Sequence, residues 1–301
     1  MDYGFSKTKN FLNKNKYIFK LLKILVFVVS CYYLTILCID NYQQIKGLSL
    51  KIKGNIALFV MFSSIFYVFL LIILGLGWRK ILEKIENKNI KFELVYVYLQ
   101  SLIYKYLPGN IFHYASRQIV AKKLGIKHST LLKSNLFEAI FLILSAFIFS
   151  FAFIEQWVQE SIGIFGLYFC FFIFSIVLFL NRKSKIIDLT INSMPYYILY
   201  FFGIGILCYY VINYMTENDI PYLQCVYLYS ISWIAGFVIP GAPGGIGVRE
   251  SVFVYISDNV ISQPEAIFVI LILRLSTTIG EVFSFIIAKL NKRHHIPEIP
   301  N

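Results

Sequence analysis

Two stretches of the chain place proline, glycine and arginine within otherwise apolar sequence. The first reads Y-L-P-G-N-I-F-H-Y-A-S-R over residues 106–117, and the second reads G-F-V-I-P-G-A-P-G-G-I-G-V-R-E over residues 236–250. Proline removes a backbone donor and glycine carries no side chain, so neither stretch is expected to continue a helix. The residues expected to break the helices are Pro108, Gly109, Pro240, Gly241, Pro243, Gly244, Gly245 and Gly247. Such breaks expose backbone amides and positive helix ends, which suit an anion such as a phosphate.

Polar side chains follow both breaks at spacings that favour a shared site. Asn110, His113 and Arg117 fall at i, i+3 and i+7, so a helix places them on one face. Ionisable groups in membrane-spanning sequence are costly and usually mark function. Each of two residues also has an alternative to a binding role. His113 could be a structural histidine, and Arg249 could extend to the membrane interface. The candidate residues for binding a lipid headgroup are Asn110, His113, Arg117, Glu138, Arg249, Glu250, Arg274 and Glu281.

Three of these charges lie in long apolar segments, where each needs a partner. Arg274 and Glu281 are two helical turns apart, about 10 Å, so they can line one wall but cannot pair directly. An unpaired buried charge would cost several kcal/mol. The expected partners are Glu138 or Glu250 for an arginine, and Arg117 or Arg249 for Glu281. A purely structural network of ion pairs is the alternative to a binding site.

The composition indicates a membrane protein. Of 301 residues, 58% are hydrophobic and 15% are charged, and the mean hydropathy is +0.69. Each long apolar run is near the roughly 20 residues that cross a bilayer as a helix. The runs cover about residues 21–40, 55–77, 134–154, 163–180, 194–214 and 264–288. We therefore predict an all-α, polytopic integral membrane protein with six full transmembrane helices, the first of them uncleaved, in a single domain over residues 1–301.

The basic residues predict an orientation, because lysine and arginine are retained on the cytoplasmic side. They precede the first span, follow the second, fourth and last spans, and flank the first broken stretch. The connections that hold Glu155, Glu217 and Asp258 contain no lysine or arginine, whereas the loop with Lys46 and Lys51 departs from the pattern. The prediction is a plasma (inner) membrane protein with both termini in the cytoplasm.

The two broken stretches, about 92–120 and 222–260, have basic and acidic flanks respectively, so they are expected to enter from opposite faces. We predict two re-entrant helical hairpins, or eight or more helices in all if both stretches span. Pro108 precedes Arg117 by the same nine residues that separate Pro240 from Arg249. The order of elements repeats upside down, which predicts an inverted repeat with halves at about 18–154 and 162–290.

Other classes of site lack support in the sequence. The five cysteines lie in apolar runs without the paired spacing of a metal site or a disulfide framework, so no metal is expected. The glycine-rich stretch lacks the G-K-[ST] of a phosphate-binding loop, and no cofactor is expected. The net charge of +12 comes largely from basic residues near the ends of spans, which indicates topology and anionic lipid rather than nucleic acid.

At these motifs the chain resembles the lysylphosphatidylglycerol synthase transmembrane family, a flippase-like domain found alone or fused to an aminoacyl-phospholipid synthase. The resemblance covers nearly the whole chain. It rests on Tyr106-Leu107-Pro108-Gly109 with Arg117, on the run from Pro240 to Glu250, and on Arg274. It implies a bacterial or archaeal plasma-membrane protein that moves or holds lipids. No soluble domain follows Asn301, so we expect a stand-alone member without synthase activity.

The resulting hypothesis is a lipid flippase or scramblase. Arg117, Arg249 and Arg274 would neutralise the phosphate of an anionic phospholipid or a polyprenyl-linked glycolipid. One alternative is a non-transporting scaffold of a lipid or polysaccharide biosynthesis complex. The other is a membrane transferase that acts on a lipid headgroup, although no recognised catalytic constellation is present and an enzyme is not expected. The expected partners are membrane lipids, a synthase or glycosyltransferase, and a second copy in a homodimer, with no nucleic acid.

Overall fold

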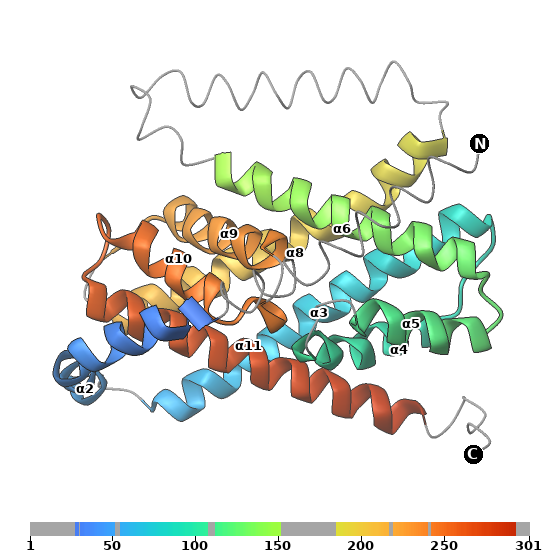
Figure 1. Ribbon diagram of the computed structural model, residues 1–301. Helices are drawn as coiled ribbons and strands as arrows, with labels where there is room; N and C mark the ends of the chain where they lie inside the picture. Colours follow the sequence, from blue (N-terminus) through green and yellow to red (C-terminus); the bar gives the residue numbers. More distant parts are fainter. Residues whose placement is uncertain are drawn as a thin grey trace, which may run out of the picture.

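The computed structural model of the chain describes residues 28–29, 31–51, 55–107, 112–151, 185–216, 219–239 and 242–292. Within these ranges the regular structure is entirely helical (Figure 1). Besides a helix over Cys31–Asp40, the elements are α2 (Tyr42–Lys51), α3 (Ile56–Glu86), α4 (Glu93–Ser101), η1 (Leu102–Tyr106), α5 (Phe112–Lys123), α6 (His128–Phe151), α8 (Lys185–Met215), α9 (Tyr222–Val238), η3 (Pro243–Gly245), α10 (Val248–Ser257) and α11 (Gln263–Lys292).

Four helices are long and apolar enough to cross a membrane, namely α3, α6, α8 and α11. They correspond to the predicted spans at 55–77, 134–154, 194–214 and 264–288, and α3 and α8 continue about three turns beyond the apolar runs. The predicted span at 163–180 lies outside the described residues, as does most of the first half of the span at 21–40. The predicted loop that holds Lys46 and Lys51 is in fact helix α2.

Helix α3 is central to the packing, since it contacts α4, α6, α8 and α11. It begins where the side chain of Asn55 accepts a hydrogen bond from the backbone N of Leu58 (3.2 Å), and it ends at Asn87, whose φ of 52° leaves the helical region. Small residues let the neighbouring helices approach closely. A methyl group on Gly280 of α11 would lie 2.9 Å from the carbonyl oxygen of Ser64 in α3.

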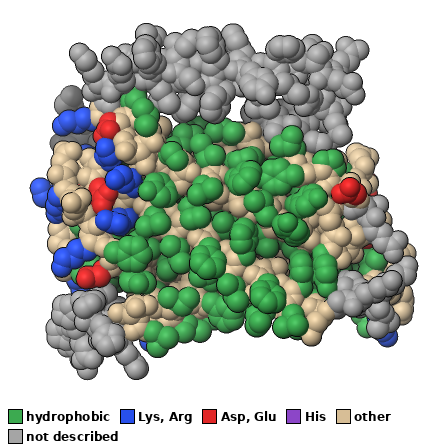
Figure 2. Space-filling view, turned by 180° about the vertical axis from the view of Figure 1, so that it is seen from behind, with side chains coloured by type: hydrophobic (Ala, Val, Ile, Leu, Met, Phe, Trp, Pro, Cys, Tyr) green, Lys and Arg blue, Asp and Glu red, His purple; other side chains and the backbone are tan. Residues whose placement is uncertain are grey.

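Charged and apolar side chains are segregated along the long axis of these helices. The C-terminal ends of α3 and α11 and the N-terminal ends of α6 and α8 lie at the same end of the molecule (Figure 1). Lys84 pairs with Asp188 there at 2.8 Å, and Thr130 donates to Glu86 at 2.5 Å. Figure 2 shows lysine and arginine at this end and a broad hydrophobic band beside it. This distribution is consistent with a helical membrane protein.

Both broken stretches are interrupted as predicted. The first divides into α4, η1 and α5, and the second into α9, η3 and α10. The central residues of the breaks, Pro108, Gly109, Asn110, Pro240 and Gly241, lie outside the described residues. Their neighbours meet, because η1 contacts η3. A methyl group on Gly244, which has a φ of 61°, would lie 2.9 Å from the ring of Tyr106.

Candidate functional site

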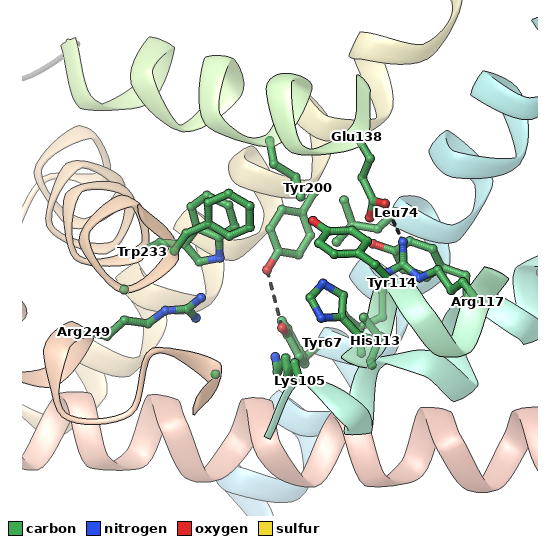
Figure 3. Close-up of a pocket in the computed structure, with 17 residues that line it drawn as sticks. Tyr67, Leu74, Lys105, His113, Tyr114, Arg117, Glu138, Tyr200, Trp233 and Arg249 are labelled. Atoms are coloured by element: carbon green, nitrogen blue, oxygen red, sulfur yellow. Dashed lines mark hydrogen bonds and ion pairs between the residues drawn. The ribbon is translucent and has the colours of Figure 1, made fainter. Parts of the chain in front are cut away.

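A cavity of about 80 Å³ lies where the two broken stretches approach each other. A cavity of this size has room for several water molecules or for a small group such as a phosphate. Four predicted headgroup-binding residues line it, namely His113, Arg117, Glu138 and Arg249. Gly244, one of the predicted helix-breaking residues, also contributes to the wall. Helices from both halves of the sequence therefore build one site (Figure 3).

Arg117 and Glu138 form a buried ion pair on one side of the cavity. The side chains of Arg117 and Glu138 are only 1% and 2% exposed, and Nη1 of the arginine donates to Oε2 of the glutamate. The guanidinium also donates to Oγ of Ser101 at 2.6 Å and lies 3.9 Å from the ring centroid of Tyr98. The expected pairing of an arginine with Glu138 is confirmed, and it leaves Arg117 already neutralised.

Arg274 and Glu250 form a second ion pair, next to the η3 turn. Nε of Arg274 lies 2.5 Å from Oε1 of Glu250, and Nη2 donates to the carbonyl oxygen of Gly244 at 3.3 Å. The other carboxylate oxygen of Glu250 accepts from the backbone N of Gly247 at 2.7 Å, which caps the start of α10. Glu250 therefore holds the glycine turn against α11, and its expected pairing with an arginine is confirmed.

Arg249 differs from these two arginines because it has no carboxylate partner among the described residues. Its Nε is buried and makes no hydrogen bond, and its guanidinium lies 5.5 Å from the ring of Trp233. The stem passes between two glycines: a methyl group on Gly236 would lie 2.3 Å from its Cγ, and one on Gly245 would lie 2.8 Å from its Nε. The fold thus delivers an unneutralised cation to the cavity (Figure 3).

His113 faces the same cavity from α5. Its Nδ1 is buried without a hydrogen-bond partner, and its ring packs on Tyr114 with the centroids 3.9 Å apart. Figure 3 shows His113 and Arg249 reaching toward the space beside Tyr67 and Tyr200. Buried polar atoms in proteins normally have partners, so two without them at one cavity indicate a place for a ligand or ordered water.

Glu281 pairs with a residue that the sequence analysis did not select. Its Oε1 accepts from Nζ of Lys105 and from the hydroxyl of Tyr67 at 3.4 Å, whereas its Oε2 has no partner. The prediction that Arg117 or Arg249 pairs with Glu281 is therefore wrong. Lys105 reaches α11 because η1 tightens the chain just before the break and packs against that helix.

The charges around the cavity do not cancel. Lys105, Arg117 and Arg274 each pair with one carboxylate, on Glu281, Glu138 and Glu250 respectively. Arg249 remains, so within the described part of this cluster the formal balance is one positive charge. An uncompensated cation in a mostly apolar interior is costly, and a bound anion relieves that cost.

The described residues contain no cluster of three or more histidine, cysteine, aspartate or glutamate side chains that could hold a metal ion. The aromatic residues that complete the cavity, such as Tyr200 and Trp233, were not selected from the sequence either, since aromatic side chains are common throughout this chain. No protein-family model matches the chain, and no curated protein matches it.

Proposed function

We propose that this protein binds the phosphate of a membrane lipid between the two broken stretches and moves the lipid between leaflets, as a flippase or scramblase. The observation that carries the proposal is Arg249, which has no carboxylate partner among the described residues and lies at a central cavity opposite a second buried nitrogen without a partner, Nδ1 of His113. Backbone and side-chain donors around such a cation are the groups that recognise phosphate.

We further propose that the broken stretches are re-entrant hairpins from opposite faces, within an inverted repeat. Three contacts support this arrangement: α4 packs on α5, α9 packs on α10, and η1 meets η3 between them. Irregular backbone at membrane depth is tolerated where it is buried in protein or lines a cavity. The headgroup would lie at this junction while the acyl chains remain in the bilayer.

The cavity of about 80 Å³ has room for a phosphate group but not for a whole lipid headgroup with its glycerol. Transport therefore requires the two hairpins to separate, first toward one leaflet and then toward the other. A rocking motion of one half against the other, as in transporters with repeated halves, would open the site alternately.

Reconstituted vesicles test this function. We expect the purified protein to accelerate leaflet exchange of fluorescent phosphatidylglycerol or of a fluorescent polyprenyl phosphate, measured by quenching of the outer leaflet. Arg249→Gln should slow exchange by about tenfold or more, because a charge-assisted hydrogen bond contributes about 1.5–3 kcal/mol and 1.4 kcal/mol corresponds to tenfold.

The matched control is Lys123→Gln, which removes a positive charge from the exposed end of α5. Its exchange rate should equal that of the wild type. Equal exchange in vesicles with and without the protein, for both lipids, would reject the transport proposal. Loss of a surface product on deletion, without a change in lipid sidedness, would favour the scaffold instead.

A further inference from the structure

A buried carboxylate lies behind the cavity and is connected to it by one lysine. Glu281 is 1% exposed. Its Oε1 binds Nζ of Lys105, and its Oε2 lacks a partner. Lys105 lines the cavity. The contact between Lys105 and Glu281 therefore joins a buried carboxylate to the wall of the cavity.

The groups that surround Glu281 come from four elements. Lys105 and Tyr106 approach from η1, and the hydroxyl of Tyr106 lies 3.3 Å from Oγ1 of Thr278 on α11. Tyr67 approaches from α3, and its hydroxyl lies 3.5 Å from that of Tyr200 on α8. Arg274, on the same helix as Glu281, is held by Glu250.

Among these groups, Lys105 is the one cation that pairs with Glu281 in the described part of the chain. A ligand that attracts Lys105 therefore leaves the carboxylate alone in a buried site.

We infer that Glu281 is a proton-binding site coupled to the binding of a lipid phosphomonoester, an inference that rests on the proposed function. Arg249 supplies one uncompensated positive charge. A phosphomonoester carries close to two negative charges above neutral pH, so it calls for a second cation. Lys105 supplies that charge by leaving Glu281 for the phosphate.

The proton balance of this step is simple. The ion pair between Lys105 and Glu281 breaks, an O–H bond forms on the Glu281 carboxylate with a proton taken from solvent, and Lys105 stays charged against the phosphate. Release of the lipid reverses each change. A phosphodiester, with one negative charge, is matched by Arg249 alone and leaves Glu281 paired.

Thermodynamic linkage fixes the sign of the pH dependence. If the complex holds one proton more than the free protein, affinity for the phosphomonoester falls about tenfold for each unit of pH rise while the ligand stays dianionic. A proton gradient across the membrane then biases the direction in which a phosphomonoester lipid moves.

Titration calorimetry on the full-length protein in nanodiscs tests the inference. Binding is measured at about pH 8, where the monoester is close to dianionic, in two buffers of different ionisation enthalpy, with three probes: dihexanoyl phosphatidic acid, dihexanoyl phosphatidylglycerol and inorganic phosphate. We expect uptake of about one proton with phosphatidic acid and about none with phosphatidylglycerol.

Glu281→Gln should bind phosphatidic acid with about no proton uptake and with an affinity that does not depend on pH above about pH 8, where the monoester is close to dianionic. Asp258→Asn, which neutralises an exposed carboxylate at the end of α10, should behave as the wild type. If Glu281→Gln does not fold, Lys105→Gln replaces it, and this variant should lose proton uptake and weaken phosphatidic acid binding more than phosphatidylglycerol binding.

The outcomes separate this inference from the proposed function. Phosphatidic acid binding without proton uptake, or with uptake unchanged in Glu281→Gln, overturns the coupling and leaves headgroup binding intact. Binding of none of the three probes overturns the proposed function as well. Proton-coupled binding of inorganic phosphate without binding of phosphatidic acid assigns the site to free phosphate and overturns the lipid assignment.

Discussion

At the scale of single residues, the position of Arg249 depends on two neighbours that lack side chains. Its stem runs between Gly236 in α9 and Gly245 in η3, and neither position has room for a methyl group. Gly245 also adopts a φ of 75°, which L-residues rarely take. The backbone of these two glycines therefore fixes the position of the Arg249 side chain. A substitution at either glycine would move the guanidinium without changing its charge.

Gly236→Ala tests this arrangement. The new methyl group would lie 2.3 Å from Cγ of Arg249, so the guanidinium must move out of its place beside Trp233. We expect lipid exchange in vesicles to fall by about tenfold, as for the loss of one charge-assisted hydrogen bond.

The control for this substitution is Gly47→Ala in α2, where the added methyl group meets nothing within 4 Å. Alanine is favoured over glycine in a helix by about 0.5–1 kcal/mol, so this variant should keep full activity and gain slight stability. A rate of lipid exchange equal to the wild type in Gly236→Ala would show that the position of the Arg249 guanidinium does not matter for transport.

The sequence predicts several of the charges around the cavity and the pairing of Glu138 and Glu250 with arginines, but it predicts neither Lys105 nor its pairing with Glu281. Arginines and glutamates in apolar sequence stand out because burial makes them costly. Lys105 does not stand out, since it lies between two tyrosines and before the first break rather than among the polar residues that follow it. Its partnership with Glu281 spans 176 residues and depends on the three-dimensional path of η1, which local pattern does not encode.

At the scale of elements, the Arg117–Glu138 pair joins α5 to α6, and Ser101 adds the end of α4. Helix α5 has few other anchors of this kind, since Arg117 and Ala121 are its buried residues. The pair therefore positions the helix that carries His113 as well as shaping the wall of the cavity.

Removing one partner of this pair should destabilise the protein strongly. Arg117→Gln leaves the buried carboxylate of Glu138 without a positive charge beside it. Glu138→Gln likewise leaves the buried guanidinium of Arg117 without a negative charge beside it. Each should cost about 3–5 kcal/mol of unfolding free energy, measured by denaturant titration in detergent micelles. The double variant Arg117→Met with Glu138→Leu should recover most of that loss, because it leaves no buried charge.

Lys84→Gln provides the comparison, because its pair with Asp188 is more exposed, with side chains 26% and 53% accessible. We expect it to cost no more than about 1 kcal/mol. A loss for Arg117→Gln as small as that of Lys84→Gln would show that the buried pair does not hold α5 in place.

Element boundaries were harder to predict than element type. The apolar run at 55–77 predicts a helix correctly, but α3 continues to Glu86 through a basic, amphipathic end. That extension is stabilised by contacts outside the membrane-length run, such as the pair of Arg79 with Glu83 at 2.8 Å. Hydropathy indicates the length of the apolar part of a helix. It does not indicate the residue at which the backbone hydrogen bonds of the helix end.

At the scale of the whole molecule, lysine and arginine side chains gather at the end formed by the C-termini of α3 and α11, whereas α10 and α2, which contains Lys46 and Lys51, lie toward the opposite end (Figures 1 and 2). The exposed Asp258 follows the last residue of α10. The positive-inside rule places the basic end in the cytoplasm. The same rule places Asp258 outside. This orientation is a prediction from charge distribution, and it can be read directly by chemical labelling.

Single cysteines at Lys123 and Asp258 test the orientation, in a background where the five native cysteines are replaced by alanine. A membrane-impermeant maleimide should label Asp258→Cys in intact cells. It should label Lys123→Cys only after the membrane is permeabilised, and this second step controls for the reactivity of both positions. The reverse pattern would show that the molecule lies the other way up.

The paired breaks could be recognised from the sequence because proline and glycine interrupt apolar runs so plainly. The distribution of basic residues predicts that the two breaks enter from opposite faces and can meet. The structure shows a contact between η1 and η3. The inverted repeat stays a prediction, because the predicted span at 163–180 lies outside the described residues.

The ring of Tyr106 against Gly244 has a consequence for the permeability of the membrane. In the described part of the chain, this aromatic ring packs against bare backbone at the contact between η1 and η3, which would narrow the path of water and ions there. Under the proposed function, the headgroup would then cross an occluded chamber rather than an open channel. We therefore expect a cell that carries many copies of this protein to keep its transmembrane voltage while the proposed lipid exchange proceeds.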